Sequence, residues 1–233
     1  MAAIIQNAHV ARKEKLAICQ DTGLPVVFLE VGQGVCIKGD VQDAIQKGVA
    51  EGYRKGSFRT SIIKDPLSRG IPSYAPVVVH TELVKGEKIK ITVLPKGFGC
   101  ENKTQLKMFL PTAGWPQVKS FIVEAVRLAE ADACPPYVVG VGLGGTSDYA
   151  CILAKKALLR KVSTSYAPRL KSRMSKEREL LDAINALHIG PMGLGGNATA
   201  LAVHIEKYPT HIAGLAVCVN VSCHALRSAT VQL

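Results

Sequence analysis

Three cysteines in polar or glycine-rich surroundings are the residues of this sequence best suited to chemistry. Cys19 lies in CQDTG, Cys134 begins CPPYVVGVGLGGT, and Cys223 lies in NVSCHALRSA. They are 115 and 89 residues apart, so no short metal-finger spacing joins them and only the fold could bring them together. Three thiolates from distant loops suit an iron–sulfur cluster in which one iron is left free for chemistry.

The CQDTG segment has two interpretations. It places a thiol, an amide, a carboxylate and a hydroxyl in consecutive positions between the apolar residues Ile18 and Leu24. It could be a polar turn before a strand. Alternatively, Cys19 is a metal ligand and Asp21 is a carboxylate that takes part in acid–base chemistry.

Two glycine-rich segments, VGVGLGGT and GPMGLGGNATA, are also open to two interpretations. Each could be a tight connection between elements, or could present backbone N–H groups to a small anion. The first matches the dinucleotide fingerprint only loosely, without an acidic residue about 20 positions further on. The second lacks the GKS or GKT of a P-loop. We therefore do not expect nucleotide binding.

Two histidines and one arginine are further candidate site residues, although each would be ordinary if it stood alone. His211 precedes the last apolar run, and it gains weight because Cys223 lies on the same terminal segment; His224 is a competing candidate beside Cys223. Arg59, in SFRTS, follows an expected helix and has the planar fork that binds carboxylates.

Composition indicates an ordinary globular chain of 233 residues, with 48% hydrophobic and 20% charged residues, and we expect a single domain over 1–233. The formal charge is +11. Lys and Arg are spread along expected helices without interleaved aromatic residues, so we expect no nucleic-acid binding. A positive field would instead attract a small dicarboxylate.

Cysteine usage and the N-terminal sequence indicate a cytoplasmic protein. The cysteine count, seven, is odd, and MAAIIQNAHVARKEK lacks a signal-peptide pattern. No stretch approaches the roughly 20 apolar residues of a membrane helix, so no membrane association is expected. Cys36, Cys100, Cys151 and Cys218 are expected to be small buried hydrophobic residues.

Hydrophobic periodicity predicts a mixed α/β fold, in which antiparallel hairpins and strand–helix units form small mixed sheets surrounded by helices. Asp40 is expected to cap the second helix, and Ser175 the last one. A short KGE turn predicts a hairpin of the second and third strands, and an exposed loop is expected over 163–174. The expected helices are 1–18, 41–55, 117–131, 147–161 and 176–187, and the expected strands are 24–32, 76–84, 88–94, 137–143, 200–206 and 215–222.

Taken together and in order, five segments resemble the class I fumarases and L-tartrate dehydratases, and in particular their α subunit. These segments are CQDTG, PKGFGCENKT, CPPYVVGVGLGGT, GPMGLGGNATALAVHIE and PTHIAGLAVCVNVSCHALR. The resemblance runs from about residue 4 to the C-terminus. Only 18 residues precede CQDTG, where members of this family usually carry a longer helical segment.

The resemblance implies a cofactor, a set of site residues and a partner. It implies a [4Fe–4S] cluster held by Cys19, Cys134 and Cys223, and catalytic roles for Asp21 and His211. A separate β subunit would complete the active site in a heterodimer or heterotetramer. The residues that the resemblance places near a small dicarboxylate substrate are Gln20, Arg59, Gly99 and Asn102.

The implied reaction is the reversible hydration of fumarate to L-malate. L-Tartrate dehydratase, which gives oxaloacetate, is the first alternative, and a non-catalytic iron–sulfur sensor or electron carrier is the second. Two features depart from the family pattern or complicate it. Phe98 and Cys100 stand where glycine and serine are more common, and Cys218 is a second cysteine in the last motif.

Overall fold

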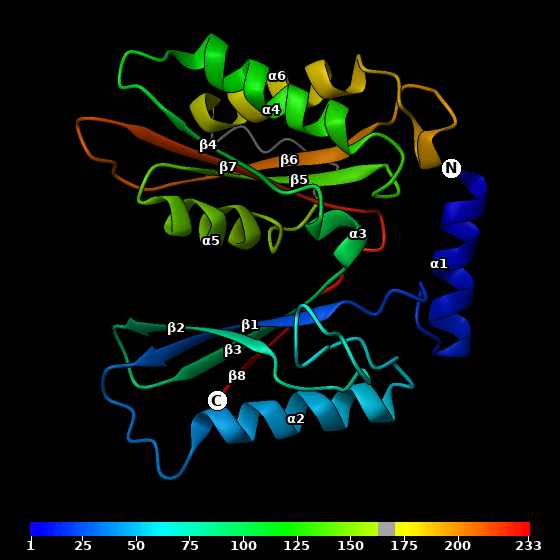
Figure 1. Cartoon of the computed structure of the whole chain (residues 1–233), viewed down its shortest axis with the longest axis vertical. Coiled ribbons are helices and arrows are strands. Elements are labelled where there is room, and N and C mark those ends of the chain that lie inside the picture. Colours follow the sequence, from blue (N-terminus) through cyan, green and yellow to red (C-terminus); the bar gives the residue numbers. More distant parts are fainter. Residues whose placement is uncertain (163–170) are drawn as a thin grey trace. The chain divides into compact units, whose positions relative to one another are not determined.

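The computed structural model describes residues 1–162 and 171–233, and of residues 171–175 it describes the backbone alone. The chain forms two compact units, residues 1–98 with 227–233 and residues 99–226. Each unit contains a four-stranded mixed sheet with helices, which confirms the predicted mixed α/β class (Figure 1). The prediction of one domain concerns how the units act together, and it stays a prediction.

The first unit is built on a sheet with the strand order β2-β1-β3-β8. Strand β1 pairs in parallel with β2 and antiparallel with β3, and β8 pairs antiparallel with β3. The elements of this unit are α1 (Ala2–Glu14), β1 (Leu24–Gly32), α2 (Val41–Lys55), β2 (Val78–Val84), β3 (Ile89–Lys96) and β8 (Ala229–Gln232).

The predicted hairpin of β2 and β3 is wrong, because β1 lies between these two strands. Two residues that follow β1 bond to the link between β2 and β3: Gln33 N donates to Val84 O, and Gly34 N donates to Gly86 O. The end of β1 therefore lies against the link that was expected to be the hairpin turn. Residues 25–29 of β1 are buried without interruption, whereas much of β2 is exposed. The central position therefore goes to the more apolar strand.

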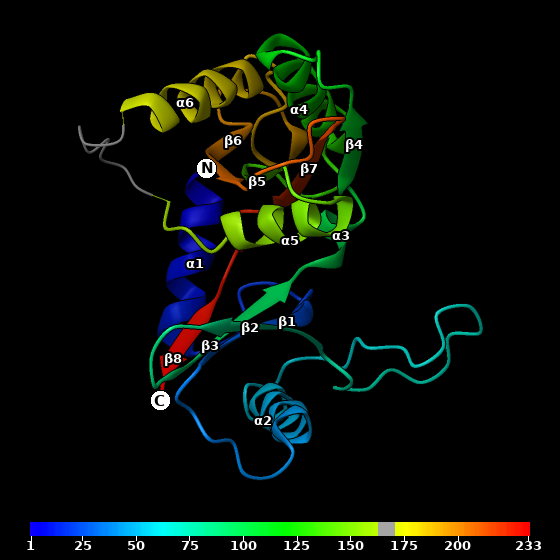
Figure 2. The same cartoon turned by 90° about the vertical axis from the view of Figure 1, so that its left-hand side faces the viewer.

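Helix α2 packs on one face of this sheet and positions the loop before β1. The Asp40 side chain caps the helix by accepting from Asp43 N at 2.9 Å, as predicted. Ile45 packs with Val27 and Leu29 of β1. Between α2 and β2 a long connection extends away from the helix and the sheet (Figure 2).

The second unit has the strand order β4-β7-β5-β6, with α4 and α6 on one face and α5 on the other (Figure 1). β5 and β6 are parallel, and β7 is antiparallel to both β5 and β4. The elements are α3 (Phe98–Glu101, which begins at the last residue of the first unit), β4 (Gln105–Phe109), α4 (Trp115–Ala129), β5 (Tyr137–Leu143), α5 (Ser147–Ala157), α6 (Lys171–Asn185), the 3-10 helix η2 (Pro191–Gly193), β6 (Ala200–Lys207) and β7 (Leu215–Ser222).

Two glycines of β5 set how closely α5 approaches the sheet. A Cβ at Gly140 would lie 2.1 Å from Ala154 O, and one at Gly142 would lie 2.0 Å from Ala150 O. Real side chains do not approach a carbonyl oxygen so closely, so both positions require glycine. Part of the VGVGLGGT segment therefore serves helix packing.

Most of the expected elements are confirmed, with differences at their ends. Strands β4 and β8 were not predicted, since both are short and carry polar residues. Helix α6 begins at Lys171, before the expected cap at Ser175. Of the loop expected over 163–174, residues 163–170 lie outside the described residues. The prediction is wrong for residues 171–174, which belong to α6. None of the described helices combines the length and apolar character needed to cross a membrane.

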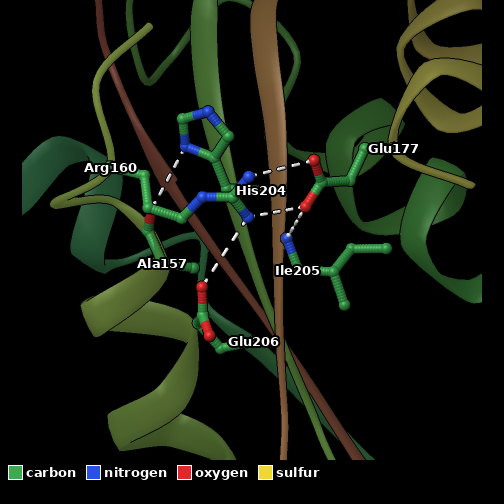
Figure 3. Close-up of polar contacts among 6 residues, drawn as sticks. All are labelled: Ala157, Arg160, Glu177, His204, Ile205 and Glu206. Carbon is green, nitrogen blue, oxygen red and sulfur yellow. Dashed lines mark hydrogen bonds and ion pairs between the residues drawn. The ribbon is translucent and has the colours of Figure 1, made fainter. Parts of the chain in front are cut away.

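A buried polar cluster ties α5, α6 and β6 together (Figure 3). Glu177 of α6 accepts from Arg160 Nη1 at 2.6 Å and from Ile205 N at 2.8 Å. His204 Nδ1 donates to Ala157 O, the last residue of α5, at 3.1 Å. Because Glu177 is almost fully buried, its charge depends on these donors.

Candidate functional site

The CQDTG loop holds the carboxylate of Asp21 in one orientation. Asp21 Oδ1 accepts from Gly23 N at 3.0 Å, and Oδ2 accepts from Phe98 N at 2.9 Å. Arg227 Nη2 donates to the backbone carbonyl of Asp21 at 2.7 Å. The Asp21 amide in turn donates to Cys19 Sγ at 3.4 Å. The candidate carboxylate and the candidate thiolate are therefore fixed by the same short loop.

Two side chains of the segment 53–61 donate hydrogen bonds to backbone carbonyls of this loop. Tyr53 donates its hydroxyl to Thr22 O at 2.9 Å, and Ser61 donates to Gly23 O at 3.2 Å. Burial raises the pKa of Tyr53 to about 12, so its hydroxyl keeps the proton that it donates. A Cβ at Gly23 would lie 2.7 Å from the carbonyl carbon of Pro95, so this tight packing requires glycine.

Two of the predicted substrate-binding side chains lie exposed in the first unit. Gln20 is exposed, and its amide oxygen accepts from Cys19 Sγ at 3.4 Å. The backbone carbonyl of Arg59 accepts from Thr22 Oγ1 at 3.3 Å, which fixes the base of the side chain beside the loop. In the described part of the chain, the guanidinium of Arg59 has no hydrogen bond or ion pair.

In the second unit, Cys134 and Cys223 lie at the same edge of the sheet. Val138, four residues after Cys134, pairs with Ser222, and Cys223 follows Ser222 directly. Cys134 has a positive φ of 55° and donates its backbone N–H to Ala131 O. The antiparallel pairing of β5 and β7 thus places the start of one strand beside the end of the other.

The segment with Gly99 and Asn102 is attached to the Cys134 loop. Cys100 donates its thiol to Ala133 O at 3.2 Å, and Lys103 pairs with Asp132 at 2.6 Å. Asn102, between them, is exposed. These contacts place the two predicted site residues of this segment next to a predicted cluster ligand.

A second set of contacts attaches the same segment to β7. Glu101 Oε1 pairs with Lys155 of α5 at 2.6 Å, while Glu101 Oε2 accepts from Asn220 Nδ2 at 2.9 Å. Asn220 also donates to Thr104 Oγ1 at 2.8 Å. Asn220 lies three residues before Cys223, so Glu101 links the segment to the strand that carries that cysteine.

The four remaining cysteines differ from one another in burial. Cys100 and Cys218 are buried, as predicted. Cys100 packs in the main core of the second unit, and Cys218 packs against the alanines of α5. The burial prediction is wrong for Cys36, which is exposed, and Cys151 is only half-buried.

Of the two candidate histidines, His224 and not His211 lies at the edge with Cys223. His211 precedes β7 and Cys223 follows it, so the eight-residue strand, roughly 26 Å long, separates them. His211 is exposed, and its Nδ1 accepts from Ala213 N. Within this unit the fold does not bring His211 to Cys134 or Cys223.

Most of the backbone amides of the glycine-rich segments bond within the fold. Gly144 N donates to Ala216 O, Gly145 N to Pro209 O, and Gly195 N to Ile189 O. Gly190 N donates to Thr199 Oγ1 at 3.3 Å. These amides are not available to a bound anion, so the interpretation as tight connections is the better one here.

The donor set fits an iron–sulfur cluster in its chemistry. All seven cysteines are free thiols; Cys134 is exposed, and Cys19 and Cys223 are half-buried. His224 Nδ1, next to Cys223, is buried without a hydrogen-bond partner among the described residues, so a polar partner at this edge would satisfy it. No set of three or more His, Cys, Asp or Glu side chains that could hold a metal ion occurs within either unit, as far as the structure describes them.

Sequence comparisons agree with this arrangement of motifs. The family model described as "Fumarate hydratase (Fumerase)" matches residues 1–232. "Putative L(+)-tartrate dehydratase subunit alpha" of Methanocaldococcus jannaschii is 38% identical, over 98% of this chain and 82% of the relative. "L(+)-tartrate dehydratase subunit alpha" of Escherichia coli UTI89 is 32% identical, over 92% and 72% respectively. This chain therefore belongs to the fumarate hydratase family of hydro-lyases.

Proposed function

We propose that this chain is the α subunit of an iron–sulfur hydro-lyase that reversibly hydrates fumarate to L-malate in the cytoplasm. The observation that carries the proposal is the geometry of Asp21. Its carboxylate is fixed by two backbone N–H groups, two residues from a free thiol. A fixed carboxylate beside a metal ligand suits proton transfer to or from a bound substrate.

The proposed ligands of a [4Fe–4S] cluster are Cys19 of the first unit and Cys134 and Cys223 of the second. Three thiolates leave one iron without a cysteine ligand. When bound, the cluster supplies this iron as a Lewis acid that polarises the substrate hydroxyl.

The chain's own residues would bind the substrate and move a proton. Arg59 is proposed to bind a carboxylate, because its exposed guanidinium has no partner in the described part of the chain. Gln20, Gly99 and Asn102 are exposed and are proposed to line the same substrate site. Asp21 is proposed to exchange the proton.

His211 has the least support among the predicted site residues, because β7 separates it from Cys223. We keep its catalytic role as a hypothesis from sequence resemblance alone. A β subunit is proposed to supply the remaining catalytic and carboxylate-binding groups. The relatives named as alpha subunits support such a partner.

L-Tartrate is the alternative substrate, and a specific observation favours it. The two relatives described above are both named for L(+)-tartrate dehydratase. Tartrate differs from malate by a second hydroxyl group. The residues that receive this hydroxyl would decide between the two substrates.

Anaerobic reconstitution of the chain with iron, sulfide and its β subunit tests the proposal. We expect iron–sulfur absorbance together with turnover of malate, measured against tartrate at equal concentrations. Faster turnover of tartrate would establish the alternative. Reconstituted cluster without turnover of either compound would contradict the hydro-lyase proposal for this chain.

A further inference from the structure

Residues 63–72, here called the 63–72 arm, form the outer part of the connection between α2 and β2 (Figure 2). Leu67 and Ile71 on this arm expose 91% and 93% of their surface, the highest values for large hydrophobic side chains among the described residues. A single exposed aliphatic residue is ordinary. Two of them on one protruding segment indicate a surface that another molecule covers.

The arm is held in shape by its own hydrogen bonds. Asp65 Oδ1 accepts from Leu67 N at 2.8 Å and from Ser68 N at 2.7 Å. Arg69 N donates to Asp65 O at 3.0 Å, and Ile62 is buried at the base of the arm. A segment that already has its bound shape loses less conformational entropy when it docks. These bonds therefore favour a role in recognition.

The charge around Leu67 and Ile71 is positive. Lys64 and Arg69 form no ion pair in the described part of the chain, while the Asp65 carboxylate is engaged by the turn. The whole chain carries a formal charge of +11, so two copies repel each other. Charge complementarity thus favours an acidic partner over a second copy of this chain.

The base of the arm is joined to the loop that carries Asp21. Arg59 O accepts from Thr22 Oγ1, and Ser61 donates to Gly23 O, just before the arm begins. A molecule seated on the arm would therefore be attached to the segment that supports the candidate site.

We propose that the 63–72 arm is the docking element for the β subunit. Leu67 and Ile71 insert into an apolar pocket of that subunit, and acidic side chains at its rim pair with Lys64 and Arg69. This inference rests on the proposed function, since it names the surface through which the partner joins the site.

The test measures binding of the purified β subunit to this chain by calorimetry, with the double variant Leu67→Asp and Ile71→Asp. We expect a Kd at least about 100-fold weaker, because each substitution would bury an unpaired carboxylate in the apolar pocket. The control is Leu83→Asp with Leu194→Asp, which adds the same charge at exposed leucines elsewhere. The control should bind as wild type, and all the proteins should melt at similar temperatures.

The outcomes separate the arm from the proposed function. Equal affinity of the wild type and the arm variant overturns the arm proposal and leaves the two-subunit enzyme intact. Failure of the wild type to bind the β subunit overturns both. Self-association of the wild type that the arm variant abolishes identifies a second copy as the occupant. Sedimentation with phosphatidylserine vesicles that depends on Leu67 and Ile71 identifies a lipid surface. Either of the last two results also overturns the proposal.

Discussion

Asp21 is oriented without being neutralised. Its two carboxylate oxygens accept from Gly23 N and Phe98 N, and Arg227 binds the backbone carbonyl and not the carboxylate. No cation forms an ion pair with this carboxylate in the described part of the chain. Its orientation is therefore set by backbone N–H groups and by no ion pair among the described residues.

Replacing Asp21 with Asn removes the carboxylate that exchanges a proton, and it keeps only one of the two side-chain oxygens that accept from Gly23 N and Phe98 N. We expect a normal cluster and a loss of about 10²-fold or more in kcat. Iron–sulfur absorbance is to be compared with turnover in the same preparation. Asp40→Asn is the matched control, since Asn caps a helix as well as Asp. If absorbance and turnover fall together, Asp21 serves only to hold the Cys19 loop.

Replacing Arg59 with Lys tests its proposed role as a carboxylate ligand. The charge is kept, but the planar fork is lost. We expect kcat/KM to fall well over tenfold at unchanged cluster content. Arg12→Lys, on α1, should leave the kinetics unchanged. Wild-type kinetics in Arg59→Lys would show that Arg59 is an ordinary surface residue.

The sequence singles out candidate reactive residues by their types, but it does not show which residues hold them in place. Cys19 and Asp21 stand out because a thiol and a carboxylate occur together in a short polar segment. Arg227 is 206 residues from Asp21, and Tyr53 has the spacing of an ordinary core residue. Contacts of this kind depend on the tertiary fold, so no local pattern predicts them.

At the scale of elements, strand and helix positions were predictable and strand neighbours were not. The apolar runs locate β1, β5 and β7 closely. The short link between β2 and β3 suggested a hairpin, but β1 occupies the place between them. Periodicity reports which faces are buried, whereas strand order depends on competition among all the strands for the central positions.

The space around Gly142 of β5 and around Gly48 of α2 predicts opposite effects for two glycine substitutions. In Gly142→Ala, the new Cβ would lie 2.0 Å from Ala150 O, so we expect a loss of about 3 kcal/mol or more in unfolding free energy. Gly48, inside α2, has no atom within 4 Å of a new Cβ. Gly48→Ala should therefore stabilise by about 1 kcal/mol. Urea unfolding measures both, and a tolerated Gly142→Ala would refute the close packing.

The cluster that joins α5, α6 and β6 predicts a pH dependence of stability. Burial, with a further contribution from Arg160, holds the pKa of His204 below its usual value. The unfolded chain then binds a proton more readily than the folded one. Stability from this group is present above about pH 6.5 and falls as the pH decreases, by at most about 1.4 kcal/mol per pH unit.

Urea unfolding between pH 8 and pH 5 measures this effect in the wild type and in His204→Gln. The variant should lose less stability on acidification than the wild type. His9→Gln, at an exposed position, is the control and should follow the wild type. Parallel profiles for His204→Gln and the wild type would exclude His204 as the group responsible.

At the scale of the whole molecule, the residues proposed for the site are divided between the two units. Cys19, Gln20, Asp21 and Arg59 belong to the first, and Gly99, Asn102, Cys134 and Cys223 to the second. Within each unit the fold brings its members to one loop cluster or one sheet edge. That these residues form one site stays a prediction from the family resemblance, which spans residues 1–232.

The proposed ligand set predicts which cysteines each unit contributes to the cluster. Cys→Ala substitution at position 19, 134 or 223 should abolish a stable cluster, since each removes one of three thiolates. Cys100→Ala and Cys218→Ala remove buried thiols that pack in the core of the second unit, so both variants should keep the cluster and lose only some stability.

Iron and sulfide content after anaerobic reconstitution, together with low-temperature electron paramagnetic resonance, measures the outcome independently of turnover. Loss of the cluster in Cys218→Ala with retention in Cys223→Ala would show that Cys218, and not Cys223, is the third ligand. Retention in Cys19→Ala would show that the second unit holds the cluster without the first.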